Sequence, residues 1–190
     1  MKTPKILINH NCLDMIIASA VEVCPKETNG LLIGRPINGD IRVRMAYPFQ
    51  TDRRMPGSVE HGNISALKRL LSTLDTMNRQ IMGGYHSHPY PDGHIRLTKS
   101  DVEHIEEEIE RIRKLKSRDA EKWAELVLSV KRKRYEKLFN VGKHISNNGN
   151  HLRVVVRTGN YIGFDVKIAG YVLKENCSTI KKTKAVCLLN

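Results

Sequence analysis

Aromatic residues, long apolar runs and closely spaced cysteine pairs are scarce or absent in this chain. Aromatic side chains make up only 5% of its 190 residues, so it is poor in the rings on which single-stranded nucleic acids stack. No uninterrupted apolar run reaches the ~18 residues typical of a membrane-spanning helix. The apolar stretch near the N-terminus is too short for a signal peptide. These absences predict a protein without a membrane span.

The four cysteines contain no Cys-x-x-Cys pair. We therefore expect reduced, mostly structural thiols in a cytoplasmic protein. Nothing around Cys24 indicates an activated nucleophile. The cysteines are Cys12, Cys24, Cys177 and Cys187.

The composition is ordinary for a globular protein. Hydrophobic residues make up 40% and charged residues 27% of the chain, and this length suffices for a core without disulfides or a structural metal. No internal repeat and no low-complexity linker divides the sequence. Residues 1–190 are therefore predicted to form a single domain.

Hydrophobic periodicity predicts an α/β fold in which helices pack on a mixed, curved sheet. Residues 123–132 fit either a helix or a strand, and the short, β-branched run at 126–130 favours a strand. Asn11 is predicted to cap the first helix and Pro25 to end it. Residues 31–33 and 41–45 are predicted to form a hairpin around residues 36–40, and a loop is expected at residues 49–62. The predicted helices are residues 13–23, 64–77 and 99–116, and the predicted strands are residues 6–8, 31–33, 41–45, 81–88, 126–130, 152–156 and 163–173.

The run Gly-Tyr-His-Ser-His-Pro at residues 84–89 is the most informative segment. Alternate side chains of a strand share a face, so His86 and His88 point to the same side. After a loop rich in proline and glycine, Thr98 is predicted to be a helix N-cap, with Asp101 in the first helical turn. A His-x-His pair alone is often a solvated strand feature, and Thr-x-x-Asp alone is often a simple cap. Together they supply two imidazoles and a carboxylate, which with one water are typical of a catalytic zinc site.

A second element lies upstream, in residues 25–35. Glu27 is placed at a predicted helix-to-strand junction, directly before an apolar strand. A zinc hydrolase needs a general base, and a glutamate suits this role when a dry pocket raises its pKa toward neutrality. Alone, Glu27 would be read as an exposed carboxylate at the end of a helix.

Glu27 before Gly-Leu-Leu-Ile-Gly, then His-Ser-His-Pro, then Thr-Lys-Ser-Asp, resembles the JAMM motif of the MPN/JAB metalloprotease family. The resemblance spans most of the chain, with the metal site drawn from residues 25–35 and 81–102. It implies an MPN/JAB-like, cytidine-deaminase-like sandwich, with a strand at residues 126–130. It also implies one zinc ion per chain and hydrolysis of peptide or isopeptide bonds, next to the tail of a ubiquitin-like or other small protein.

The resemblance assigns a role to each matching residue. His86, His88 and Asp101 would hold the zinc ion. Glu27 would be the general base. Thr98 would take the place of the family serine that helps to hold the oxyanion.

The chain departs from the family motif in two ways. Threonine replaces serine at position 98, which keeps the hydroxyl and adds a methyl group. The segment between Pro89 and Thr98 is also about two residues longer than the commonest family spacing. Aligning Ser100 with the family serine would place Glu103 where the motif has aspartate, so Thr98 with Asp101 is the better match.

The net charge of +12 leaves other functions open. Basic clusters occur at residues 111–118, 131–134 and 181–184, and the segment 111–150 is the least clearly assigned part of the chain. A basic surface is typical of nucleic-acid binding, but it also steers acidic protein partners or aids solubility. The alternatives to a peptidase are therefore a catalytically weak MPN-type interaction module and a nucleic-acid-associated protein, the latter less favoured because aromatics are few.

Two further segments are candidates for substrate contacts. His94 lies in the loop before Thr98, close enough in sequence to touch substrate or to support a metal ligand. In the family, the region corresponding to residues 49–62 lies beside the cleft, so it is the candidate for contacts with a substrate tail. The sequence identifies neither the substrate nor the oligomeric state.

Overall fold

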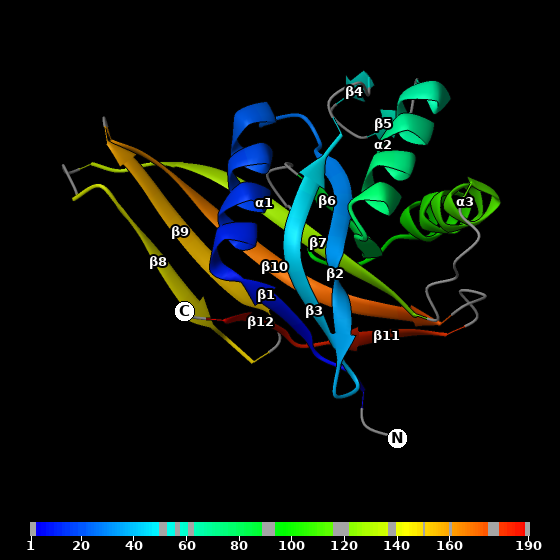
Figure 1. Cartoon of the computed structure of the whole chain (residues 1–190). Coiled ribbons are helices and arrows are strands. Elements are labelled where there is room, and N and C mark those ends of the chain that lie inside the picture. The colour runs from blue at the N-terminus through cyan, green and yellow to red at the C-terminus, as the bar shows by residue number, and fades with distance from the viewer. Residues whose placement is uncertain are drawn as a thin grey trace.

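The computed structural model describes residues 3–49, 53–55, 58–60, 63–88, 94–115, 122–136, 140–149, 151–159, 161–174 and 179–188. Figure 1 shows its strands and helices. Their order along the chain is β1 (Ile6–Asn9), α1 (His10–Val23), β2 (Asn29–Ile37), β3 (Asp40–Pro48), β4 (Arg53–Met55), β5 (Ser58–Glu60), α2 (Ile64–Thr76), β6 (Gln80–His88), α3 (Lys99–Leu115), β7 (Lys122–Arg134), β8 (Gly142–Asn147), β9 (Leu152–Gly159), β10 (Ile162–Lys174), β11 (Ile180–Thr183) and β12 (Ala185–Leu188).

One curved, ten-stranded sheet dominates the fold. Its strand order is β12-β1-β3-β2-β6-β7-β10-β9-β8, and β11 pairs with β10. The pairs β1–β12, β1–β3 and β6–β7 are parallel, and the other pairs are antiparallel. The predicted mixed, curved α/β sheet is confirmed. The sheet is larger than expected, so the fold of the described residues is dominated by its ten strands and not by the three helices packed on it.

The two faces of the sheet carry separate apolar cores. Alternate residues of β7 point to opposite faces, so Leu126 and Leu128 pack in one core while Trp123 and Val127 pack in the other. Helix α1 covers the first core with Leu13 and its neighbours. Helices α2 and α3 cover the second core, as Figure 1 shows on the opposite side of the sheet from α1.

Two local predictions were wrong at their boundaries. Strand β1 runs directly into α1, so Asn9 takes the N-cap position and Asn11 lies within the helix; no side chain caps this end. The predicted hairpin is confirmed, since β2 and β3 pair antiparallel, but its turn is shorter than residues 36–40. It consists of Asn38 (φ 49°) and Gly39 (φ 83°) in the left-handed region, as a tight hairpin requires. Pro36 lies within β2, beyond the residues that pair with β6, where its missing N–H is tolerated.

Other differences come from segments with weak sequence patterns. Strands β8, β11 and β12 were not predicted, and β7 is longer than the predicted 126–130. The strand interpretation of 126–130 is confirmed. The expected loop at 49–62 contains the small hairpin β4–β5, and residues 50–52, 56–57 and 61–62 lie outside the described residues.

The thiols and helices carry two further findings. Cys12, Cys24 and Cys187 are free, and Cys177 lies outside the described residues. Burial raises the pKa of Cys24, which agrees with the absence of activation. No helix in the described part of the chain combines the length and apolar character needed to cross a membrane.

One buried carboxylate links three strands of the sheet. Asp165 on β10 is only 6% exposed. It accepts hydrogen bonds from Arg153 Nε at 2.8 Å, Arg153 Nη2 at 2.6 Å and Lys133 Nζ at 2.8 Å. These cations hold the pKa of Asp165 well below its usual value of 3.8.

We expect Asp165→Asn to lower the free energy of unfolding at neutral pH by about 2 kcal/mol, the scale of a charged hydrogen bond. A carboxyl whose pKa falls on folding adds stability above its unfolded pKa and loses that stability as the pH drops. The difference from the parent protein should therefore shrink below about pH 4. Denaturant unfolding from neutral to strongly acidic pH measures it, with the exposed Glu107→Gln as control. A difference that is independent of pH would contradict this assignment.

Candidate metal centre

Strand β6 positions two imidazoles on one face at its end. His86 and His88 are two residues apart on this strand, and their ring centroids lie 5.0 Å apart. His88 is 8% exposed, and the His86 side chain is 15% exposed. The sequence-based expectation that both side chains share a face is confirmed.

Each imidazole uses its Nδ1 atom in a hydrogen bond to an acceptor of the protein. His86 Nδ1 donates to Glu125 Oε1 at 2.9 Å, and His88 Nδ1 donates to the His94 carbonyl at 3.0 Å. These bonds fix the tautomers and leave both Nε2 lone pairs for another partner. Both Nε2 atoms face Asp101 Oδ2, at 3.8 Å from His86 and 3.5 Å from His88.

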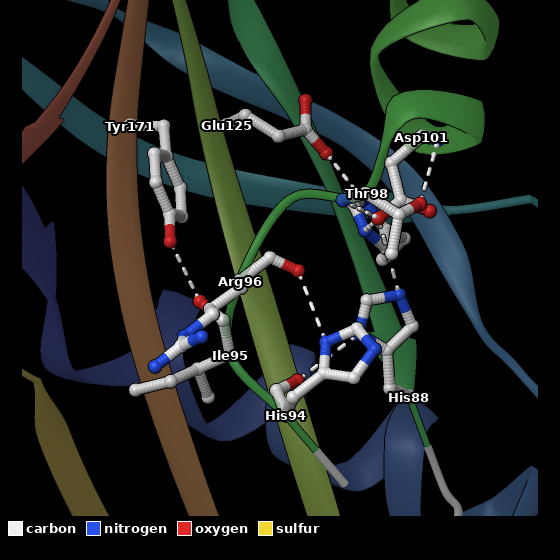
Figure 2. A network of polar contacts seen from close by, with 9 residues as sticks. His88, His94, Ile95, Arg96, Thr98, Asp101, Glu125 and Tyr171 are labelled. Atoms are coloured by element: carbon white, nitrogen blue, oxygen red, sulfur yellow. Dashed lines mark hydrogen bonds and ion pairs between the residues drawn. The ribbon is translucent and has the colours of Figure 1, made fainter.

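Asp101 is oriented by the start of α3. Thr98 N donates to Asp101 Oδ2 at 2.7 Å, and Asp101 N donates to Thr98 Oγ1 at 3.1 Å. This reciprocal pair is a capping box, and Figure 2 shows both residues above His88. The predicted N-cap role of Thr98 is confirmed. The cap leaves the second carboxylate oxygen of Asp101 outside this pair of hydrogen bonds.

Glu125 was not predicted from the sequence. It is 2% exposed on β7, and its Oε2 accepts a hydrogen bond from Trp123 Nε1 at 2.9 Å. Gly84 leaves room for it, because a Cβ there would lie 2.9 Å from Glu125 Oε2. A single acidic residue inside the apolar run 123–130 is the signal that would have found it, since a buried carboxylate needs partners.

A short segment before α3 supports the other imidazole. Tyr171 Oη donates a hydrogen bond to the Ile95 carbonyl at 2.7 Å. This bond holds the backbone next to His94, whose carbonyl accepts the hydrogen bond from His88 Nδ1. The His94 ring packs on His88 with centroids 4.5 Å apart, and its Nδ1 donates to the Arg96 carbonyl at 3.1 Å. Figure 2 shows these contacts on one side of the site. His94 therefore supports a metal-site residue, one of its two predicted roles.

The electrostatics of the group favour a cation. Burial acts to lower the pKa of His86, but its contacts with Asp101 and Glu125 outweigh burial and raise the pKa to about 10. Burial acts to raise the pKa of Asp101, while its contacts with His86 and His88 hold it well below its usual range. Carboxylates thus attract positive charge to the imidazoles. A divalent ion would displace a proton held there, because metal ligands bind deprotonated.

The donor atoms fit one metal ion. The ligand atoms of His86, His88 and Asp101 all lie within 4.8 Å of one another, a spacing that one ion can bridge after small side-chain adjustments. His86 Nε2 is buried and has no hydrogen-bond partner among the described residues, so it lacks the interaction that a ligand would supply. Two nitrogen atoms and one oxygen atom suit several transition metals.

Glu27 lies directly beside the imidazoles. Asn29 on β2 pairs with His86 on β6, and Thr28 and Ser87 continue this pairing with two hydrogen bonds, 2.9 Å and 3.0 Å long. Glu27 comes just before this paired segment, and its carboxylate lies close enough to be influenced by the charges of His88 and His86. Glu27 is half-buried, and burial raises its pKa despite the nearby imidazoles.

Asn29 is a second polar residue that the sequence reasoning missed. It pairs with His86, so both side chains lie on the same face of the sheet. Its Oδ1 atom is buried, and no residue in the described part of the chain forms a hydrogen bond with it. A polar group that enters the site would satisfy this oxygen.

The comparisons with known proteins concern the fold. No model of a known protein family and no curated protein matches the chain. The chain is similar to the solution structure of protein DSY2949 from Desulfitobacterium hafniense, with a TM-score of 0.52 and 17% sequence identity. The match covers 97% of this chain and 94% of that chain. At this identity the likeness supports the fold alone.

We expect Glu125→Gln to weaken divalent-ion binding by about 10- to 100-fold, because it removes the carboxylate that orients His86. His88→Ala should abolish stoichiometric binding, since it removes a ligand. Competition titrations with Zn²⁺ and a chelator measure both effects. Glu106→Gln on the exposed side of α3 is the control for a change of charge. Equal affinity of Glu125→Gln and the parent protein would contradict this role.

Proposed function

We propose that this chain is a zinc-dependent metallopeptidase of the JAMM type. It would hydrolyse peptide or isopeptide bonds next to the tail of a ubiquitin-like or other small protein in the cytoplasm. The proposal includes the MPN/JAB-like, cytidine-deaminase-like assignment of the fold and the choice of zinc as the metal.

One observation carries the proposal. His86, His88 and Asp101 come together, and Glu27, just before the start of β2, lies near enough for their charges to act on its carboxylate. A pair of histidines and a carboxylate would be enough to hold a structural ion. A hydrolase also needs a general base, and the half-buried glutamate near that group can supply one. A purely structural metal site has no need of such a residue. The motif resemblance supports the same assignment of roles.

His86 and His88 through Nε2, and Asp101 through its carboxylate, would hold the ion. Zinc bound by three protein ligands lowers the pKa of a water in its open position and polarises a substrate carbonyl.

Glu27 is the general base and acid of this mechanism. Its raised pKa brings it closer to the operating pH, where a carboxylate transfers protons best. It accepts a proton from the attacking water and delivers that proton to the departing amine. The amine is then a peptide N-terminus or the side chain of a lysine.

Thr98 supplies a hydroxyl beside Asp101. Its oxygen already accepts the Asp101 N–H, which fixes its position, and its own proton is left for a substrate oxygen. We assign this donor to the carbonyl oxygen as negative charge develops on it.

Glu27→Gln should lower kcat by about a thousandfold while zinc stays bound, because glutamine keeps the shape but cannot carry the proton. A panel of linear and isopeptide-linked ubiquitin-like fusions measures the activity, and metal analysis measures zinc. Glu22→Gln on the exposed side of α1 is the matched control. Full activity of Glu27→Gln would refute the assigned mechanism.

Thr98→Ala should reduce kcat by about a hundredfold through the lost donor, whereas Thr98→Ser should retain activity because the hydroxyl remains. Zinc affinity must be measured on the same proteins. If Thr98→Ala lowers zinc affinity as much as it lowers kcat, Thr98 acts only through its cap on α3.

The catalytically weak interaction module makes opposite predictions. Such a module needs neither stoichiometric zinc nor Glu27. Freshly purified protein that holds no zinc and takes none up when it is supplied would favour that alternative.

A further inference from the structure

The face of the sheet that carries the metal centre continues beyond it. His86 pairs with Val127 and His88 pairs with Ser129 on the parallel strand β7. Strand β6 ends at His88, but β7 runs on to Arg134. With a period of two residues, Lys131 and Lys133 follow Ser129 on this same face.

Neighbouring strands add further cations to this face. On β10, Lys167 pairs with Ser129 and Asp165 pairs with Lys131. On β9, Arg153 pairs with Lys167 and Arg157 pairs with Gly163. Paired residues project to the same side. We call the resulting surface the basic sheet face, and it consists of Lys131, Lys133, Arg153, Arg157 and Lys167.

The basic sheet face begins close to the metal centre. His88, Ser129 and Lys167 occupy adjacent strands in one row, so the Cα of Lys167 lies about 10 Å from that of His88, two strand spacings away. Arg153 is one strand further along the row. The apolar core under α2 and α3 ends before this row, since it contains Val127 and Ala169, while Lys131 and Lys167 are exposed.

Little negative charge offsets these cations. Among the described residues that pair across this face, the acidic one is Asp165. Its carboxylate is buried and accepts hydrogen bonds from Arg153 and Lys133. Neither Lys131 nor Lys167 forms an ion pair with another described residue. The pKa of His151 is lowered, first by burial and then by the positive charges of Lys167, Lys182 and Arg153. Two of these cations belong to the basic sheet face, so its charge acts on a neighbouring imidazole.

We propose that the basic sheet face docks an acidic segment of a polypeptide substrate and leads it into the metal centre, an inference that rests on the proposed peptidase function. Charge complementarity and direct continuity with the site support this occupant. A single-stranded nucleic acid fits less well. On β7 and β10 the aromatic residues of this side of the sheet, Trp123 and Tyr171, are buried and so do not offer a surface for base stacking. Tyr135, just after β7, packs on Gly163 with Arg157 over its ring.

The test compares two charge reversals of equal size. Lys131→Glu with Lys167→Glu changes the basic sheet face without touching any residue of the metal centre. Lys68→Glu with Arg69→Glu makes the same change in net charge on exposed positions of α2. The probe is a fluorescein-labelled peptide with a block of glutamates followed by Gly-Gly. Fluorescence anisotropy measures its Kd for the zinc-loaded protein at several salt concentrations.

We expect the first variant to raise the Kd by about tenfold and to flatten its salt dependence, while the α2 variant stays near the parent value. Zinc affinity should be the same in all three proteins. A thymidine oligonucleotide is titrated in parallel. Tighter binding of the oligonucleotide than of the peptide, with loss in the first variant, would overturn the proposal in favour of nucleic acid. An unchanged peptide Kd would also overturn it.

Cleavage assays separate this proposal from the proposed function. If the parent protein cleaves fusions and the first variant shows the same KM for acidic and neutral tails as the parent, the docking surface is wrong and the peptidase stands. If the peptide Kd depends on Lys131 and Lys167 but the protein cleaves no fusion and holds no zinc, the acidic docking surface stands and the peptidase is wrong.

Discussion

The pairing of β6 with its two neighbours is the constraint on which the site depends. On one side, the antiparallel register with β2 sets Asn29 opposite His86, so that Glu27, two residues earlier, lies within electrostatic reach of the imidazoles. On the other side, the parallel register with β7 sets Glu125 beside Gly84, which is two residues before His86 and therefore on the same face. A shift of one residue in either register would turn these side chains to the other face of the sheet. One strand therefore brings His86 and His88 together with the buried Glu125, while Asp101 comes to them from the start of α3.

Close packing of backbone supports this arrangement. A Cβ at Gly83 would lie 1.7 Å from the Ala124 carbonyl, and one at Gly30 would lie 2.3 Å from the Tyr47 carbonyl. Side chains larger than hydrogen at these positions would push the neighbouring strands apart. The glycines near the histidines thus have a packing role. This role explains why β6 carries two glycines shortly before His86 and His88.

Short-range patterns predicted much of the fold and the site. The two-residue period placed His86 and His88 together, and Thr98 with Asp101 was recognisable as a cap. Glu125 and Asn29 were missed because their importance comes from strand pairing between distant segments, which a local pattern does not contain. The edge strands β8, β11 and β12 were missed for a related reason. They are half-exposed and short, so their apolar alternation is weak, and pairing with β9, β10 and β1 defines them.

The parallel strand β1 lies between β3 and β12, so Ile6 has Ile41 on one side and Ala185 on the other. During synthesis on the ribosome, β1 and β3 can pair early, whereas the opposite edge of β1 stays open until Ala185–Leu188 has left the exit tunnel. Closure between such distant segments is slow, and open strand edges are prone to intermolecular pairing. Until those residues emerge, the nascent chain carries an exposed strand edge, and this is the period in which a chaperone would protect it from aggregation.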